Sequence, residues 1–234
     1  MSLSWDDFEF VSTNSYFNRY NIPKDQIVIS LIPNTIYRSF HPSVYCGHII
    51  HHIKQIPNNA PTLEQYWYML QVYKKDLPKY SSKTNPLTIE PKPEFFENVN
   101  NDFVVSLNSH NRKYPKYKQP VYFYHVNETT NKPEHLNIHD SRVLFSKMYE
   151  HKIMNVSNEA KQMLPNIVSI CKNRNKQYNI IIRGNHCENE VIENENEFKE
   201  IFNNGKHNFG FEYCFVDMLI HYPNVDKCLW NVCE

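Results

Sequence analysis

The chain has 234 residues, and its 25 Lys and Arg balance its 25 Asp and Glu, which argues against a protein covered with DNA-binding charge. No apolar run reaches the roughly 18–20 residues of a membrane span, and the acidic, aromatic start MSLSWDDFEF excludes an intact signal peptide. With only four glycines and neither GxGxxG nor GxxxxGK[ST], the sequence also lacks the phosphate loops of nucleotide-binding folds.

The first predicted elements are a short helix and a buried strand. Ser4 and Asp7 have the spacing of a capping box, which predicts a helix or turn at the start of residues 4–20. Residues 27–32 (IVISLI) are continuously rich in apolar side chains and predict a buried strand that Pro33 stops.

The strongest helical pattern in the chain follows Thr62, which predicts a helix over residues 63–77 with an apolar stripe on one face. The four prolines within about residues 78–98 predict an extended segment there. Residues 102–107 and 121–126 predict two strands, with a basic loop between them.

The C-terminal part of the chain predicts five more elements. They are two helices, a buried strand, a polar helix and a last strand or strand–helix element, at residues 141–154, 157–174, 178–183, 193–204 and 211–220. Pro165 predicts a kink or a late start in the second helix, and Gly205 a C-cap for the polar helix. We therefore expect an α+β fold, with a mixed or antiparallel sheet packed by several helices in one compact domain over residues 1–234.

A basic, tyrosine-bearing loop is the first feature that suggests a function. Its cations could pair with phosphates, and its aromatic rings could stack on unpaired bases, as in RNA recognition. The predicted RNA-binding residues are Arg112, Lys113, Tyr114, Lys116, Tyr117, Lys118 and, further along the chain, Lys206. A solvated hairpin loop is the alternative interpretation of the same residues.

A dispersed set of ionisable residues suggests RNA cleavage. Transesterification without a metal needs a base for the ribose 2′-hydroxyl, an acid for the 5′-oxygen and a cation near the phosphorane. Glu9 and His207 are the candidate acid–base pair, and Arg142 or Arg183 is the candidate cation. This hypothesis requires no cofactor.

At these residues the chain resembles the ribotoxin subunits of killer toxins encoded by yeast linear plasmids. Those proteins share an Asn-, Ile- and Tyr-rich composition, a glutamate near the mature N-terminus, a histidine in about the last tenth of the chain, an essential arginine between them and a C-terminal cysteine. Glu9, His207 and Cys228 or Cys233 stand in corresponding places. The resemblance implies a metal-independent endonuclease that cleaves tRNA anticodon loops and leaves a 2′,3′-cyclic phosphate. It also implies secretion and action in a target-cell cytosol, with room for a delivery or assembly partner; otherwise a cytoplasmic protein is expected.

Two alternatives belong to other classes. A non-enzymatic interaction protein would fit the scarcity of glycine and the aromatic content. A zinc-binding protein would use Cys46, His48 and His52, since thiolate and imidazole are good zinc ligands. Residues 184–186 (GNH) are similar to a segment of calcineurin-like metallophosphoesterases, but the carboxylates that bridge two metals in that family are missing here.

Overall fold

The computed structural model describes residues 2–15, 21–44, 63–64, 67, 71–72, 122–127, 130 and 132–232. The chain forms two compact units, of which the first comprises Met1–Val44 with Arg142–Glu234 and the second Tyr45–Ser141. The organisation of residues 1–234 as a single domain stays a prediction.

The first unit contains a four-stranded mixed sheet in the order β2-β6-β1-β7. Its strands are β1 (Phe8–Ser12), β2 (Val28–Ser30), β6 (Ile180–Gly184) and β7 (Glu190–Val191). β6 pairs in parallel with both β1 and β2, while β7 runs antiparallel to β1 at the edge. The strands predicted at residues 27–32 and 178–183 are thereby confirmed as β2 and β6.

The N-terminal element is a helical turn followed by a strand. The predicted capping box of Ser4 and Asp7 is present and starts the 3-10 turn η1 (Trp5–Asp7). A helix or turn that extends past Asp7 was a wrong prediction, because residues 8–12 form the strand β1. Phe8 and Phe10 are fully buried while the intervening Glu9 is not, so side chains alternate as in a strand. β6 pairs with all five residues of β1 on one side, and β7 pairs with Glu9 and Phe10 on the other.

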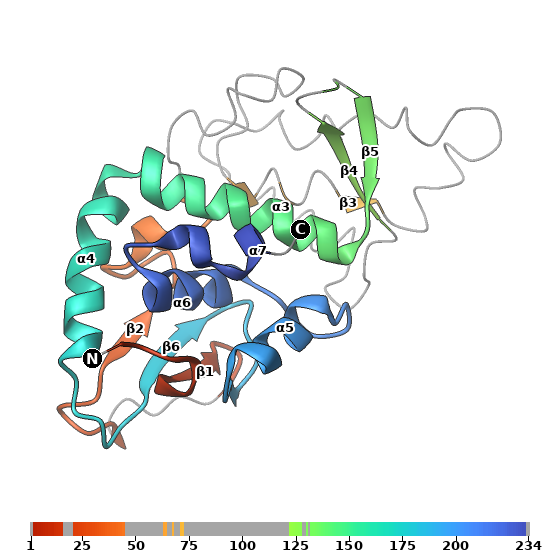
Figure 1. Cartoon of the computed structure of the whole chain (residues 1–234). Coiled ribbons are helices and arrows are strands. Elements are labelled where there is room, and N and C mark those ends of the chain that lie inside the picture. The colour runs from red at the N-terminus through yellow and green to blue at the C-terminus, as the bar shows by residue number, and fades with distance from the viewer. Residues whose placement is uncertain are drawn as a thin grey trace. The chain divides into compact units, whose positions relative to one another are not determined.

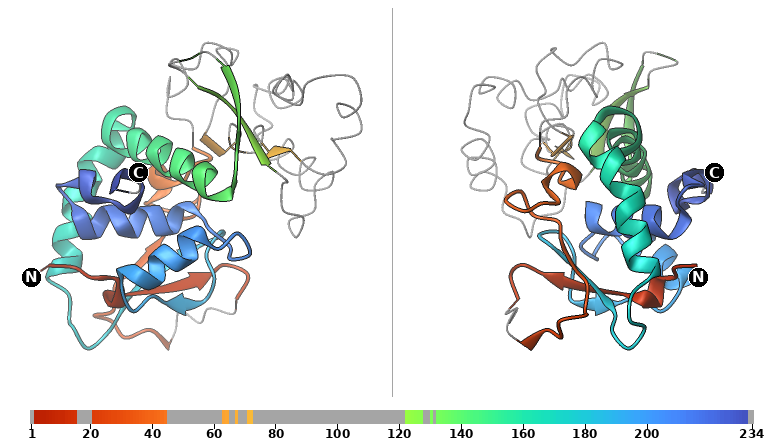
Figure 2. Two further views of the ribbon diagram at one scale, coloured as in Figure 1. Left: turned by 45° about the vertical axis from the view of Figure 1, so that its right-hand side comes forward. Right: turned by 90° about the vertical axis from the view of Figure 1, so that its left-hand side faces the viewer.

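Helices of the first unit pack against the sheet (Figures 1 and 2). The central one is α6 (Phe211–His221), whose residues from Phe211 to Leu219 are all buried, including the ionisable Glu212 and Asp217. The sequence predicted either a strand or a strand–helix element at residues 211–220, whereas the structure has a helix there. Its Tyr213 ring lies 4.6 Å from the ring of Phe10 on β1, so α6 covers the sheet face that carries Phe8 and Phe10.

The remaining helices follow the predicted pattern with shifted ends. α3 (Ile138–His151) continues into a π-helical turn (Lys152–Val156), and α4 (Asn158–Lys172) contains Pro165 and begins at the N-cap Ser157. α5 (Glu195–Asn203) ends at Asn204, one residue before the predicted cap Gly205. The short elements are η3 (Arg38–Phe40), η8 (Val225–Lys227) and α7 (Leu229–Val232).

The second unit contains an antiparallel sheet in the order β3-β4-β5. Its strands are β3 (Gln71–Val72), β4 (Tyr122–Asn127) and β5 (Lys132–Leu136). β4 confirms the strand predicted at residues 121–126, whereas β5 was missed and β3 falls inside the predicted helix 63–77. In that helix prediction, Leu63, Glu64 and Trp67 are helical. The proline-rich segment 78–98 and the strand at 102–107 lie outside the described residues.

The α+β class is confirmed, with a mixed sheet packed by several helices. Among the residues that the structure describes, no helix is long and apolar enough to cross a membrane.

Candidate functional site

The edge strand β7 places a carboxylate beside the central helix. Glu190 pairs with Phe10, and residues paired across strands point to the same sheet face, so Glu190 faces α6. There the Tyr213 hydroxyl donates a hydrogen bond to Oε1 of Glu190 and accepts one from the Glu188 amide at 3.1 Å. A glutamate on a two-residue strand is thus held by a tyrosine of the core helix.

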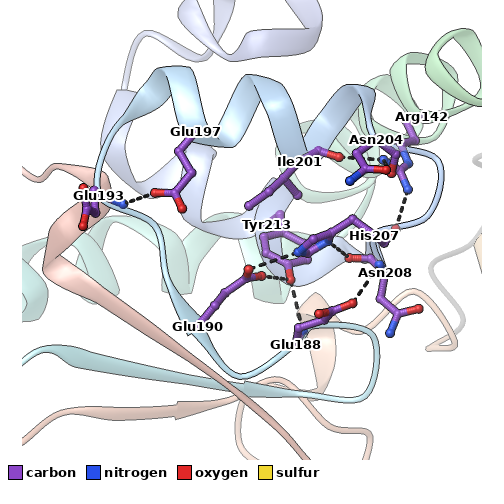
Figure 3. A network of polar contacts seen from close by, with 10 residues as sticks. All are labelled: Arg142, Glu188, Glu190, Glu193, Glu197, Ile201, Asn204, His207, Asn208 and Tyr213. Atoms are coloured by element: carbon purple, nitrogen blue, oxygen red, sulfur yellow. Dashed lines mark hydrogen bonds and ion pairs between the residues drawn. The ribbon is translucent and has the colours of Figure 1, made fainter.

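His207 lies on the loop between α5 and α6 and contacts the same glutamate (Figure 3). Its Nε2 is 3.0 Å from Oε2 of Glu190, and its Nδ1 is 2.6 Å from the carbonyl oxygen of Asn208. The Asn208 amide donates to Glu188 at 3.2 Å, which ties the loop to the segment before β7. The side chains of His207 and Glu190 remain 14% and 21% exposed, so the pair borders solvent.

The electrostatics of the pair favour an imidazolium and a carboxylate. The hydrogen bond to Glu190 raises the pKa of His207, against the opposing effect of burial. Burial alone would raise the pKa of Glu190, but hydrogen bonds from His207 and Tyr213 more than offset it, so that pKa is lowered. With both ring nitrogens at hydrogen-bond acceptors, the charged imidazolium satisfies both contacts as a donor. The pair can therefore hold a proton close to solvent.

Arg142, at the start of the first unit's C-terminal segment, supports the loop that carries His207. Its Nη1 donates to the carbonyl oxygens of Ile201, Phe202 and Asn204 at 2.8, 2.9 and 3.1 Å, and its Nη2 to that of His207 at 2.7 Å. The guanidinium carbon lies 4.9 Å from the ring centroid of Phe209. Burial lowers the pKa of Arg142 to about 10, which still leaves it charged at neutral pH.

A second ionisable group is buried next to this loop. Glu212 on α6 is 0% exposed. Its Oε1 accepts a hydrogen bond from the His186 amide at 3.0 Å, and its Oε2 has no hydrogen-bond partner among the residues that the structure describes. Burial raises the pKa of Glu212 to about 7. A Cβ atom on Gly184 or Gly210 would overlap this carboxyl group, so both glycines are needed for its close approach. Glu212 thereby joins the turn after β6 to the first turn of α6.

The structure brings together some of the predicted catalytic residues and separates others. His207 and Arg142 meet, but Arg142 binds backbone carbonyls rather than facing solvent as a phosphate-binding cation would. Glu9 pairs with Val191 and Ile181, one residue out of phase with Phe10 and Glu190, so it points to the opposite sheet face. Arg183 pairs with Val11 and shares the face of Glu9. The carboxylate that contacts His207 is thus Glu190 and not Glu9.

Other predicted residues lie outside the described part of the chain. They are the RNA-binding residues Arg112, Lys113, Tyr114, Lys116, Tyr117 and Lys118, the zinc candidates Cys46, His48 and His52, and Cys233. Lys206 is described and exposed, immediately before His207, and Cys228 is a buried free thiol. Within the described ranges, no group of three or more His, Cys, Asp and Glu is arranged to hold a metal ion.

Sequence reasoning missed Glu190 and Tyr213. Glu190 belongs to an acidic run from Glu188 to Glu200 whose charges all look solvent-exposed in the sequence. Only the alternation of β7 against β1 distinguishes Glu190 from its neighbours. Tyr213 was placed in an element of undecided type, so its hydroxyl could not be given a direction.

The chain is thus an α+β protein with a histidine–carboxylate pair at the edge of its mixed sheet. No protein-family model, curated protein or solved structure matches the chain.

Proposed function

We propose that this chain is a metal-independent RNA endonuclease that works by general acid–base transesterification, with His207 and Glu190 as its proton-transfer pair. The observation that carries the proposal is the 3.0 Å contact between the partly exposed imidazole of His207 and Glu190. A histidine with a raised pKa next to a carboxylate with a lowered one has the protonation states that acid–base chemistry near neutral pH needs.

The pair can serve both halves of the reaction in turn. The ribose 2′-oxygen attacks the phosphorus while its proton passes to the Glu190 carboxylate, because the His207 imidazolium already carries both of its ring protons. The bond from phosphorus to the 5′-oxygen then breaks as the His207 imidazolium gives a proton to that oxygen, and the proton held by Glu190 returns to His207. The products are a 2′,3′-cyclic phosphate and a 5′-hydroxyl, and no proton is gained or lost overall.

Lys206 is the cation that supports phosphate binding in this proposal. It is exposed and precedes His207, and its backbone amide donates to Asn204 Oδ1 at 3.0 Å, which fixes the start of the loop. Arg142 has a supporting role here because its four hydrogen bonds to carbonyl oxygens occupy the guanidinium. tRNA as the particular target rests on the resemblance to the killer-toxin ribotoxins.

The proposal is tested by incubating the purified protein with total tRNA in EDTA and analysing the RNA ends. We expect cleavage with 2′,3′-cyclic phosphate ends, and a loss of about 100-fold or more in rate for His207→Ala and Glu190→Gln. His221→Ala is the matched control, since His221 forms a similar pair with Asp217 at 3.3 Å and is 21% exposed. Intact RNA with the wild-type protein, or equal rates for His207→Ala and wild type, contradicts the proposal and favours the interaction-protein alternative.

A further inference from the structure

The guanidinium of Arg142 connects α3 to a stretch of chain about 60 positions later in the sequence. It donates to three carbonyl oxygens at the C-terminal end of α5, including that of the C-cap Asn204, and to the carbonyl of His207 on the loop that follows. The last carbonyls of a helix have no partners within the helix. Because the last turn of α5 contains no basic residue, Arg142 supplies from another helix the positive charge that this end favours.

The surroundings of Arg142 fit a fixed link better than a ligand-binding group. The residue is only 6% exposed, and its guanidinium lies against the ring of Phe209, which itself stacks on Tyr213 with centroids 5.6 Å apart. Tyr213 in turn donates to Glu190. Arg142 is thus linked to His207 through the backbone carbonyl of that residue, and to Glu190 through the stacked rings of Phe209 and Tyr213.

We infer that Arg142 is a positioning residue, which holds the loop at residues 204–207 so that the His207 imidazole reaches Glu190. That this positioning serves catalysis rests on the proposed function, whereas the structural link between Arg142 and the loop does not. The link depends on the planar guanidinium, whose Nη1 reaches three carbonyl oxygens with two N–H groups, one of them shared, while Nη2 reaches the His207 carbonyl. A lysine ammonium has three donors at one point and cannot span them.

The first test uses Arg142→Lys, which keeps the charge and removes the fork, and Arg174→Lys as the matched control. The Arg174 side chain is 7% exposed and binds Asp7 and the Cys171 carbonyl, and among the described residues it makes no hydrogen bond to the loop that carries His207. The readout is the pKa of His207, followed by NMR of its ring Cε1–H signal. We expect this pKa to fall toward 6.5 in Arg142→Lys and to stay raised in Arg174→Lys. An unchanged pKa in a folded Arg142→Lys protein overturns the inference.

Kinetics separate positioning from substrate binding. If Arg142 positions His207, Arg142→Lys lowers kcat, by roughly 100-fold for a displacement of about 1 Å, and leaves KM unchanged. A raised KM with kcat retained would instead mean that Arg142 contacts the substrate, and would contradict the inference. Lys206→Met is the comparison expected to raise KM.

A measurement on the wild-type protein covers the case in which Arg142→Lys does not fold. The Nη–H signals of Arg142 should exchange slowly and should not shift when a non-cleavable 2′-deoxy oligonucleotide is added. A shift specific to these signals would show phosphate contact and overturn the inference. If the wild-type protein cleaves no RNA while the His207 pKa still falls in Arg142→Lys, the proposed function fails and the positioning role stands.

Discussion

Replacing the buried Glu212 by glutamine should remove a pH dependence of stability that its carboxyl group creates. The side chain is 0% exposed, and burial raises its pKa from 4.5 to about 7. Glutamine has nearly the same shape and can still accept the hydrogen bond from the His186 amide, but it cannot ionise. The two proteins therefore differ mainly in the cost of ionising a buried group.

The sign and size of the effect follow from linkage. A carboxyl whose pKa is higher in the folded state is protonated more readily there, so below pH 4.5 it costs nothing. The free energy of unfolding then falls as the pH rises toward 7. Above pH 7 the accumulated loss is about 3 kcal/mol, because each unit of pKa difference is worth roughly 1.4 kcal/mol.

The assay is urea unfolding of wild type and Glu212→Gln at pH 4.5 and pH 8.5. We expect the difference between the two proteins in free energy of unfolding to change by about 3 kcal/mol in favour of the glutamine variant at the higher pH. Glu195→Gln is the control, since the Glu195 side chain is 51% exposed and pairs with Lys199 on the surface. If wild type and Glu212→Gln show the same pH dependence, Glu212 is not ionising in a buried site and the reasoning fails.

Three further predictions concern the site and its supports. Glu190→Gln should bring the His207 pKa, measured by NMR, down toward 6.5. The variant's loss in free energy of unfolding should be largest at about pH 4.5–6.5, because the raised His207 pKa contributes its full stability below pH 6.5 and the lowered Glu190 pKa contributes its full stability above pH 4.5. A loss that does not depend on pH contradicts this prediction. Ser157→Ala should cost about 1 kcal/mol in urea unfolding, since Ser157 caps α4, and no loss refutes the cap. Gly210→Ala should cost about 1–3 kcal/mol because its Cβ meets Glu212, and wild-type stability would be the contrary result.

Elements with strong local sequence signals were predicted correctly. Continuous apolar runs located β2 and β6, and the capping box of Ser4 and Asp7 located the turn η1. These patterns depend on a few neighbouring residues, so no distant contact is needed to interpret them. The α+β class followed from the same local signals.

The residues of the site, in contrast, are set by contacts between segments that are distant in the sequence. Residues 8–12 are a strand because β6, about 170 positions later, pairs with them, and this pairing fixes which face each side chain takes. Glu9 pairs with Val191, the neighbour of Glu190, so Glu9 and Glu190 lie on opposite sheet faces, and only Glu190 contacts His207. Arg142 likewise carries the charge that a catalytic cation needs, but its guanidinium is bound to the carbonyl oxygens at the end of α5 and therefore has a structural role. Long-range pairing and burial, which a local pattern does not contain, assign these roles.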